Sequence, residues 1–376
     1  MMSLESARVA LVHDWLTGLR GGEKCLEVLC RRFPDAPLYT LVHAKGSVSP
    51  AIERMAIRPS FLQRLPRIER HYRYALPLMP LAARWPIRHC DLVVSLSHAI
   101  AKAARPPSGV PHVCYCFTPM RYAWHMREAY FGGRIGGLKA IAVDRLMAAL
   151  RRWDRRTAAR VTHFVAISAT IRQRIMECYG RDSVIIYPPV DTDFYTPEPA
   201  IRREDYYLIL SAFAPYKRVD LAVEACNRLK KRLVVIGSGQ DEARLKALAG
   251  PTVEFLGWQP DGVLRDHLRR CRTLLFPGEE DFGMVPVEAN ACGTPVIAFG
   301  KGGATETVIP LDQDGPTGAW FAEQTVDSLA SAIEGIEGQL SSLDPGAARR
   351  QALKFDRRRY ETELISYLGC VLNQSA

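Results

Sequence analysis

The chain has 376 residues, of which 48% are hydrophobic and 24% charged, as in an ordinary soluble globular protein. Its length favours two domains, and the sequence contains no run of 18 apolar residues that would predict a membrane-spanning helix. The first 12 residues lack the pattern of a signal peptide, and the ten cysteines lack metal-ligand spacing, so we expect reduced thiols in a cytoplasmic protein.

The net charge of +10 is unevenly distributed along the chain. Residues 1–190 hold 29 Lys and Arg against 13 Asp and Glu, a net charge of +16, whereas residues 191–376 hold 21 against 27, a net charge of −6. A half that is this basic indicates an anionic partner: membrane lipid, a lipid diphosphate or nucleic acid. The alternative is a basic surface that simply faces solvent.

The first half alternates between strand and helix patterns. A strand over Arg8–His13 is followed by a loop with Gly21 and Gly22 and by a helix over Glu23–Arg32, an order that is compatible with phosphate binding. Further strands are predicted over Leu92–Ser95, His112–Cys116 and Thr162–Ile167. This alternation predicts a parallel sheet wrapped by helices.

A basic and apolar segment lies within this half. Residues Arg58–Tyr74 interleave arginines with the apolar side chains of Phe61, Leu62, Leu65 and Ile68. Such a segment can lie in a membrane interface, where anionic lipid contributes about 1 kcal/mol per nearby cation. We therefore predict that it docks on a membrane. An ordinary domain helix is the alternative, although Pro66 interrupts any single long helix.

Prolines at positions 188, 189, 197 and 199 predict a linker near residues 188–203, and a second alternation follows. Strands are predicted over Tyr207–Leu210, Arg232–Ile236 and Val253–Leu256, and helices over Val219–Leu229, Val263–Cys271 and Arg357–Leu372. We expect an α/β protein with two Rossmann-like, doubly wound domains that face a central cleft. The expected boundaries are 1–190 and 191–355, with a C-terminal helix over 356–376 that packs back on the N-terminal domain.

Two carboxylates, Glu280 and Glu288, flank a short loop and helix start between strands predicted over Thr273–Phe276 and Pro295–Phe299. The loop before the helix presents free backbone N–H groups at the positive end of the helix dipole, which suits a phosphate. A carboxylate beside a phosphate must bind something else, such as sugar hydroxyls. The segment therefore predicts a nucleotide-sugar site, and carboxylates favoured by the helix dipole are the alternative.

The segment Glu280–Glu288 resembles the signature of the retaining family-4 glycosyltransferases, which have the GT-B fold. Residues Ile185–Phe194 are similar to the interdomain strand and linker of that family, and Ala214–Glu224 to its donor-diphosphate segment. Three N-terminal segments resemble the branch of the family that assembles bacterial polysaccharides: His13–Leu16, Gly21–Lys24 and Thr118–Trp124. Mannosyltransferases are frequent in that branch.

The resemblance implies a role for each matching residue. Lys217 and Arg218 would neutralise the donor diphosphate, and Glu280 would bind hydroxyls of the donor sugar; these three are the expected catalytic residues. Glu288 would bind the ribose hydroxyls. The other expected donor-binding residues are Gly21, Gly22, Gly237, Gly257, Trp258, Phe282, Gly283, Met284 and Val285, and the expected acceptor-binding residues are Arg121, Tyr122 and Trp124. Simple packing is the alternative for Trp258, and a solvated helix start is the alternative for Lys217 and Arg218.

The implied activity is transfer of a hexose, mannose from GDP-mannose, to a hydroxyl of a lipid-linked or polysaccharide acceptor. The resemblance implies a role in cell-surface glycan synthesis, with the protein bound to the anionic lipid surface at the inner face of the membrane. It needs no metal and no cofactor beyond the nucleotide-sugar co-substrate, and it has no nucleic-acid partner. UDP-sugars remain open as donors.

Two positions depart from the family pattern. Ala212 stands where the family commonly has an arginine, and Phe117 stands where related sequences often carry a histidine. Neither side chain can neutralise phosphate or bind a hydroxyl. The alternative function is therefore a catalytically weak, nucleotide-sugar-binding GT-B protein that acts as an assembly partner.

Overall fold

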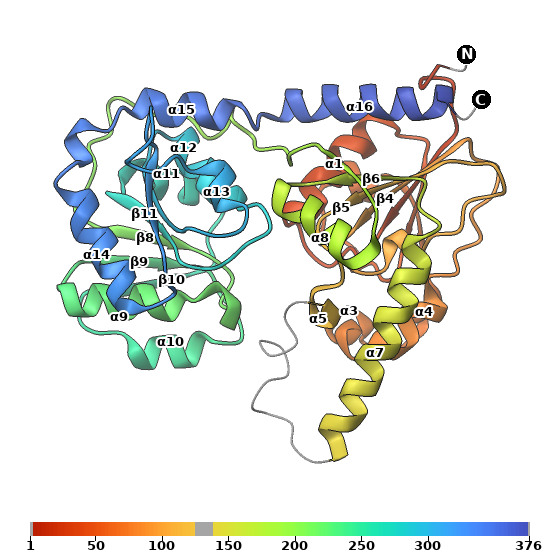
Figure 1. Ribbon diagram of the computed structural model, residues 1–376, viewed down its shortest axis with the longest axis horizontal. Helices are drawn as coiled ribbons and strands as arrows, with labels where there is room; N and C mark the ends of the chain where they lie inside the picture. The colour runs from red at the N-terminus through yellow and green to blue at the C-terminus, as the bar shows by residue number, and fades with distance from the viewer. Residues whose placement is uncertain (1–2, 125–137, 375–376) are drawn as a thin grey trace. The chain divides into compact units, whose positions relative to one another are not determined.

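The computed structural model of the protein describes residues 3–124 and 138–374 (Figure 1). The chain forms two compact units: unit 1 comprises Met1–Pro188 and Tyr360–Ala376, and unit 2 comprises Pro189–Arg359. Each unit is built on a single parallel sheet. Nothing among the described helices is both long enough and apolar enough to cross a membrane.

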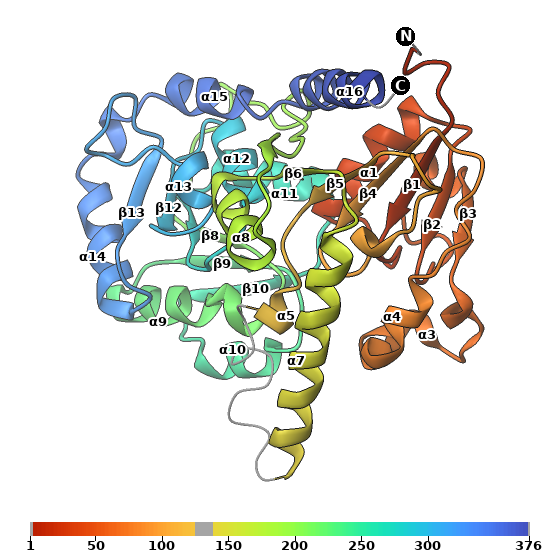
Figure 2. The same cartoon turned by 45° about the vertical axis from the view of Figure 1, so that its right-hand side comes forward.

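The sheet of unit 1 has the strand order β3-β2-β1-β4-β5-β6-β7, and Figure 2 shows β3, β2, β1 and β4 side by side. Its strands are β1 (Val9–His13), β2 (Pro37–Thr40), β3 (Ala56–Pro59), β4 (Leu92–Ser97), β5 (His112–Cys116), β6 (His163–Ala166) and β7 (Val184–Ile185). The central strands β1, β4 and β5 are buried along their whole length, as expected of a parallel sheet covered on both faces. The strand order reverses between β1 and β4, so the topological switch point of unit 1 lies between the carboxyl ends of these two strands.

Helices cover both faces of this sheet. One face packs on the segment Phe61–Ala82 and on α7, which share a core of apolar side chains with β1 and β4. On the other side, Tyr360 of α16 lies 5.6 Å from the ring of Tyr115, centroid to centroid. The helices of unit 1 are α1 (Gly21–Arg32), α2 (Pro50–Glu53), η1 (Phe61–Arg64), α3 (Ile68–His71), η2 (Tyr72–Leu78), α4 (Met79–Ala82), η3 (Ala101–Ala103), α5 (Arg121–Trp124), α7 (Leu138–Ala158), α8 (Ala169–Tyr179) and, from Tyr360 on, α16 (Arg357–Gln374).

The sheet of unit 2 has the order β10-β9-β8-β11-β12-β13, so its switch point lies between β8 and β11. Its strands are β8 (Tyr207–Leu210), β9 (Leu233–Ile236), β10 (Val253–Gly257), β11 (Thr273–Phe276), β12 (Val296–Phe299) and β13 (Gly318–Phe321). Its helices are η4 (Pro215–Lys217), α9 (Val219–Leu229), α10 (Glu242–Leu248), α11 (Asp261–Arg270), α12 (Met284–Ala291), α13 (Ala304–Thr307), α14 (Val326–Glu337), η5 (Leu340–Ser342) and α15 (Pro345–Leu353).

The predicted fold class, two Rossmann-like α/β units, is confirmed. Three short strands were not predicted: β2, β3 and β13. The strand that the resemblance implied at the start of Ile185–Phe194 is present as β7. β2 begins with Pro37 and β3 ends with Pro59, and β3 is mostly exposed, so neither carries the continuous apolar run that marks a buried strand. The predicted basic segment of unit 1 forms β3 and a series of short helical turns rather than one helix.

Candidate functional site

The switch point of unit 2 brings together two of the predicted catalytic residues. Lys217 ends η4 after strand β8, and Glu280 lies in the loop after strand β11. The ammonium group of Lys217 forms an ion pair with the carboxylate of Glu280, and the two side chains are 16% and 19% exposed. Ligands of open parallel sheets bind outside the carboxyl ends of the strands at this kind of position. A cation and a carboxylate therefore lie together where a nucleotide-sugar could bind.

Glycines allow the loops around Glu280 to pack backbone against backbone. A Cβ on Gly278 would lie 2.9 Å from Cα of Lys217, and a Cβ on Gly303 would lie 2.2 Å from Cα of Phe282. The N–H of Gly303 also donates to the carbonyl of Glu280 at 2.8 Å. Sequence reasoning missed both glycines. The run Gly300-Lys301-Gly302-Gly303 after β12 was the signal that could have found the second of them.

A second set of predicted donor residues meets at the ends of β9 and β10. Gly237 has φ +142°, and a Cβ there would lie 1.8 Å from the carbonyl oxygen of Ser211. Its N–H donates to the carbonyl of Gly257 at 2.8 Å. The neighbouring Trp258 is 75% exposed, so packing within unit 2 does not account for most of its ring. The large free indole surface is available to a ligand.

Helix α12 begins directly after the loop that holds Glu280. Gly283 is its N-cap with φ +86°, a conformation that favours glycine, and Met284 and Val285 in the first turn are half-buried. The side chain of Phe282 packs on Phe355 with ring centroids 5.4 Å apart and is buried, so Phe282 can offer a ligand only its backbone. Glu288 is 6% exposed.

The carboxylate of Glu288 lies close to Tyr195 within unit 2. Burial, together with the charge of Glu288, raises the pKa of Tyr195 above its usual range. Glu288 therefore sits in a buried polar setting rather than on the open helix surface.

Arg218 follows Lys217 in a strained backbone conformation. Its φ of +50° is uncommon for a residue other than glycine. The guanidinium Nε lies 3.3 Å from Oδ1 of Asp220. The side chain of Ala212 is exposed and offers no cation. Both predicted diphosphate-binding cations are thus paired with a carboxylate of the same unit.

At the switch point of unit 1, Asp14 organises the loop that follows β4. Its carboxylate is fully buried and accepts four backbone N–H groups, at 2.5 to 3.0 Å, from residues 98–101. Nδ1 of His98 lies 3.1 Å from the same carboxylate. Burial raises the pKa of Asp14, but the imidazoles of His98 and His13 and the backbone donors outweigh burial, so the pKa lies below its ordinary value.

The start of α1 packs against the same cluster. Gly21 begins the helix, and a Cβ on Gly22 would lie 3.3 Å from the ring of Phe117. Glu23 is buried, accepts the N–H of Arg20 at 3.0 Å and lies 3.6 Å from Nε2 of His13. Gly22 thus has a packing role within unit 1, and the roles of Gly21 and Gly22 toward a diphosphate stay predictions. The sequence alone favours a structural over a catalytic role for His98, and it assigns no role to Glu23.

The predicted acceptor residues on α5 differ from one another. The indole N–H of Trp124 donates to Asp154 at 2.8 Å, in a network where Asp154 also pairs with the buried Lys102 and accepts from Tyr179 at 2.7 Å. Trp124 therefore has a structural partner for its polar atom. Arg121 is half-buried and close enough to His98 to lower the pKa of that imidazole. The side chain of Tyr122 lies outside the described residues.

Two family models match adjoining parts of the chain. Glycosyltransferase Family 4 matches residues 17–194, and Glycosyl transferases group 1 matches residues 191–339. The chain belongs to the family-4 glycosyltransferases.

Curated relatives of this chain align over part of their length. D-inositol 3-phosphate glycosyltransferase of Geodermatophilus obscurus is 30% identical over 57% of this chain and 53% of its own. GDP-mannose-dependent alpha-(1-6)-phosphatidylinositol monomannoside mannosyltransferase of Mycolicibacterium smegmatis is 30% identical over 44% of this chain and 50% of its own. The chain thus spans about half the length of the curated relatives that it matches.

Solved structures share the fold along nearly the whole chain. HepE of Anabaena, crystallised in complex with UDP, superposes with a TM-score of 0.71 at 17% identity and covers 96% of this chain and 99% of its own. Sucrose-phosphate synthase from Thermosynechococcus elongatus superposes with a TM-score of 0.71 at 16% identity over 98% of this chain and all of its own.

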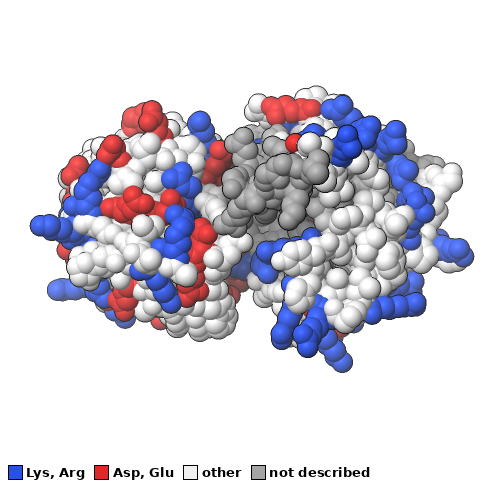
Figure 3. All heavy atoms as spheres, turned by 90° about the horizontal axis from the view of Figure 1, so that it is seen from below, with Lys and Arg blue, Asp and Glu red and all other residues white. Residues whose placement is uncertain are grey.

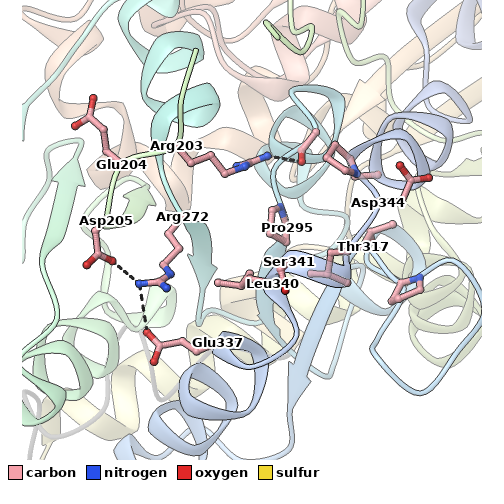
Figure 4. A pocket seen from close by; sticks show the side chains of 15 residues that line it. Arg203, Glu204, Asp205, Arg272, Pro295, Thr317, Glu337, Leu340, Ser341 and Asp344 are labelled. Atoms are coloured by element: carbon pink, nitrogen blue, oxygen red, sulfur yellow. Dashed lines mark hydrogen bonds and ion pairs between the residues drawn. The ribbon is translucent and has the colours of Figure 1, made fainter. Parts of the chain in front are cut away.

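A cavity of about 490 Å³ lies at the opposite, amino-terminal ends of the strands of unit 2 (Figure 4). Arg272 pairs there with Asp205 and lies 3.8 Å from Glu337. Arg203 donates to the carbonyl of Gly293 at 2.6 Å. These arginines connect the segments that lead into the strands of unit 2. The cavity is separate from the switch point, which lies at the carboxyl ends of the strands.

Proposed function

We propose that the protein is a retaining hexosyltransferase that moves mannose from GDP-mannose to a hydroxyl of a lipid-linked or polysaccharide acceptor. The observation that carries this proposal is the pairing of Lys217 with Glu280 at the switch point of unit 2. A cation suits the diphosphate of the donor, and a carboxylate suits the hydroxyls of its sugar. The family membership of the chain supports the same class of reaction.

The chemistry follows from these side chains. The bond between C1 of the sugar and the phosphate oxygen breaks, and the leaving diphosphate gains negative charge that Lys217 and Arg218 stabilise. The acceptor oxygen bonds to C1 on the same face, and its proton passes to the leaving phosphate oxygen. We propose that this transfer needs no metal, because the two cations balance the leaving charge.

The donor nucleotide can be tested by its effect on stability. We expect GDP-mannose to raise the unfolding temperature of the protein, because a ligand that binds only the folded state stabilises it by about 2.7 kcal/mol at 100 times its Kd. Thermal unfolding with GDP-mannose, UDP-glucose and a dTDP-sugar measures this, and radiolabelled transfer to a lipid extract then tests turnover. GDP-mannose is favoured because the curated mannosyltransferase relatives from Mycolicibacterium smegmatis and Mycobacterium tuberculosis are GDP-mannose-dependent, whereas the HepE crystals hold UDP.

A shift with UDP-sugars alone would replace GDP-mannose as the donor. A protein that no nucleotide-sugar stabilises would contradict the transferase proposal itself.

We also propose that unit 1 docks on the anionic inner face of a membrane. Four apolar side chains are 41% to 49% exposed on the segment Phe61–Ala82: Phe61, Leu65, Leu78 and Leu81. Exposed arginines lie among them at positions 64, 67, 70 and 73. Figure 3 looks at the side of unit 1 where α3, α4 and α7 lie in Figure 1, and it shows blue Lys and Arg around uncharged surface with few acidic groups. Cations around exposed apolar groups suit anionic lipid.

Liposome flotation tests the docking surface. Replacing Arg64 and Arg67 with glutamine should weaken binding to phosphatidylglycerol vesicles about thirtyfold, since each cation near the surface contributes about 1 kcal/mol. The matched control replaces Arg160 and Arg172, exposed elsewhere on unit 1, and should bind as the wild type does. Equal absence of binding to anionic and neutral vesicles would remove the membrane from the proposed function.

A second candidate function is a nucleotide-sugar-binding assembly partner with weak catalysis. The ring of Phe117 lies at the switch point of unit 1, with its centroid 6.3 Å from that of His13 and 6.1 Å from that of His98. A polar side chain at this position could bind a sugar hydroxyl, but a phenyl ring cannot. Stabilisation by GDP-mannose with no release of GDP and no transfer would favour this candidate.

A further inference from the structure

One imidazole at the switch point of unit 1 reaches solvent. The side chain of His98 is 30% exposed, whereas His13 and Asp14 are fully buried and Glu23 is 4% exposed. His98 follows β4 directly, at the carboxyl end of the strand beside β1. Of the four polar groups in this cluster, His98 alone is accessible to a ligand.

Asp14 determines how the His98 ring is oriented. A carboxylate only accepts hydrogen bonds, so Nδ1 of His98, 3.1 Å away, carries the proton and donates it. Burial lowers the pKa of His98 and outweighs the charge of Asp14, which favours the neutral ring. Nε2 then presents a lone pair. None of the residues that the structure describes forms a hydrogen bond with Nε2 of His98.

Two aromatic rings lie beside the imidazole of His98. The ring of Trp15 lies 4.4 Å from that of His98, centroid to centroid and nearly perpendicular, and the ring of Phe117 lies 6.1 Å away. Trp15 is itself held by Tyr72, with ring centroids 4.9 Å apart. The site thus offers one hydrogen-bond acceptor beside apolar ring surfaces, with the cation of Arg121 nearby, and this composition is typical of a small-molecule site with few orienting polar groups.

The chemistry of this site selects a hydroxyl group. The lone pair of Nε2 and the carboxylates of Asp14 and Glu23 behind the ring oppose an anion, against the charge of the nearby Arg121. A cation would need an accessible carboxylate, but both carboxylates are buried. A hydroxyl group on a ring with apolar C–H faces, such as a sugar, satisfies both the lone pair and the aromatic surfaces.

We propose that His98 is an acceptor-binding residue whose Nε2 accepts a hydrogen bond from a sugar hydroxyl of the acceptor, with Asp14 as the positioning residue that fixes the ring. This inference rests on the proposed function in taking the acceptor to be a glycan. It gives unit 1 a polar contact to sugar in spite of Phe117.

The experiment compares His98→Asn with the wild type. The asparagine amide can still donate to Asp14 from the place of Nδ1 but has nothing at the place of Nε2, so the fold and the Asp14 contact are retained. Binding of methyl α-mannoside, methyl α-glucoside and methyl α-galactoside is measured by NMR titration of the full chain. His163→Asn, a histidine of unit 1 that contacts Tyr367, is the matched control.

We expect His98→Asn to bind the preferred glycoside about tenfold more weakly, the effect of one lost hydrogen bond, with its unfolding temperature and its stabilisation by GDP-mannose unchanged. His163→Asn should bind as the wild type does. Glycoside binding by His98→Asn within twofold of the wild type overturns the inference, as does a wild type that binds none of the three glycosides. If GDP-mannose fails to stabilise the wild type while glycoside binding still depends on His98, the proposed donor fails and the inference stands.

Discussion

Lys217→Ala should lower the rate of sugar transfer about 100- to 1,000-fold, the usual effect of removing one group that stabilises charge developing in a transition state. The ammonium group lies at the switch point of unit 2, where the diphosphate of the donor would leave, and the exposed Ala212 offers no replacement cation. GDP release and sugar transfer measured at saturating GDP-mannose report this change. The fold should survive, because both side chains reach solvent and neither belongs to the hydrophobic core of unit 2.

Lys246→Ala provides the matched control for that experiment. Lys246 is also a lysine of unit 2, but its side chain is 55% exposed on α10 and pairs with Glu242. Its replacement should leave the transfer rate unchanged. A folded Lys217→Ala protein that keeps more than a tenth of the wild-type rate would remove Lys217 from the catalytic group.

The ion pair also predicts how the donor enters. Lys217 and Glu280 neutralise each other when no donor is bound, so the diphosphate must share or displace the carboxylate. Arg218 is likewise held by Asp220. Both cations are thus kept in place by carboxylates of their own unit before the substrate arrives. Such pre-organisation lowers the reorganisation needed when the leaving group gains charge.

The sequence could predict the parts of the site that lie close together along the chain. Glu280 and Glu288 are eight positions apart in one segment, and Lys217 follows a clear buried strand, so motif and strand pattern locate them. The alternation of apolar strands with helices likewise predicts both sheets. Short strands bounded by proline, such as β2 and β3, carry no such pattern and were missed.

The rest of the site depends on contacts between distant segments. Asp14 and the N–H of His98 are 84 positions apart, and nothing in either local sequence predicts that a buried carboxylate orients the imidazole. The network that engages Trp124 joins it to Asp154, 30 positions away. Local patterns state which residues are polar, but they do not state which polar atoms are already occupied by a partner.

Gly303→Ala should destabilise unit 2 by about 3 kcal/mol and abolish stabilisation by GDP-mannose, because the new methyl group has no space. Its Cβ would lie 2.2 Å from Cα of Phe282 and 2.5 Å from the carbonyl oxygen of that residue. The loop must then move away, and the hydrogen bond from the N–H of Gly303 to Glu280 is lost with it. Thermal unfolding should show a fall of about 6 to 12 °C for a unit of this size.

Gly262→Ala separates loss of space from the general effect of replacing a glycine in unit 2. Gly262 lies in α11, and a Cβ there meets nothing within 4 Å, so alanine should stabilise the helix by about 0.5 to 1 kcal/mol and leave donor binding intact. The two variants add the same methyl group and are expected to change stability in opposite directions. If Gly303→Ala keeps wild-type stability and still responds to GDP-mannose, the backbone contact between Gly303 and Phe282 is not what positions Glu280, and the loop must be held by its other neighbours.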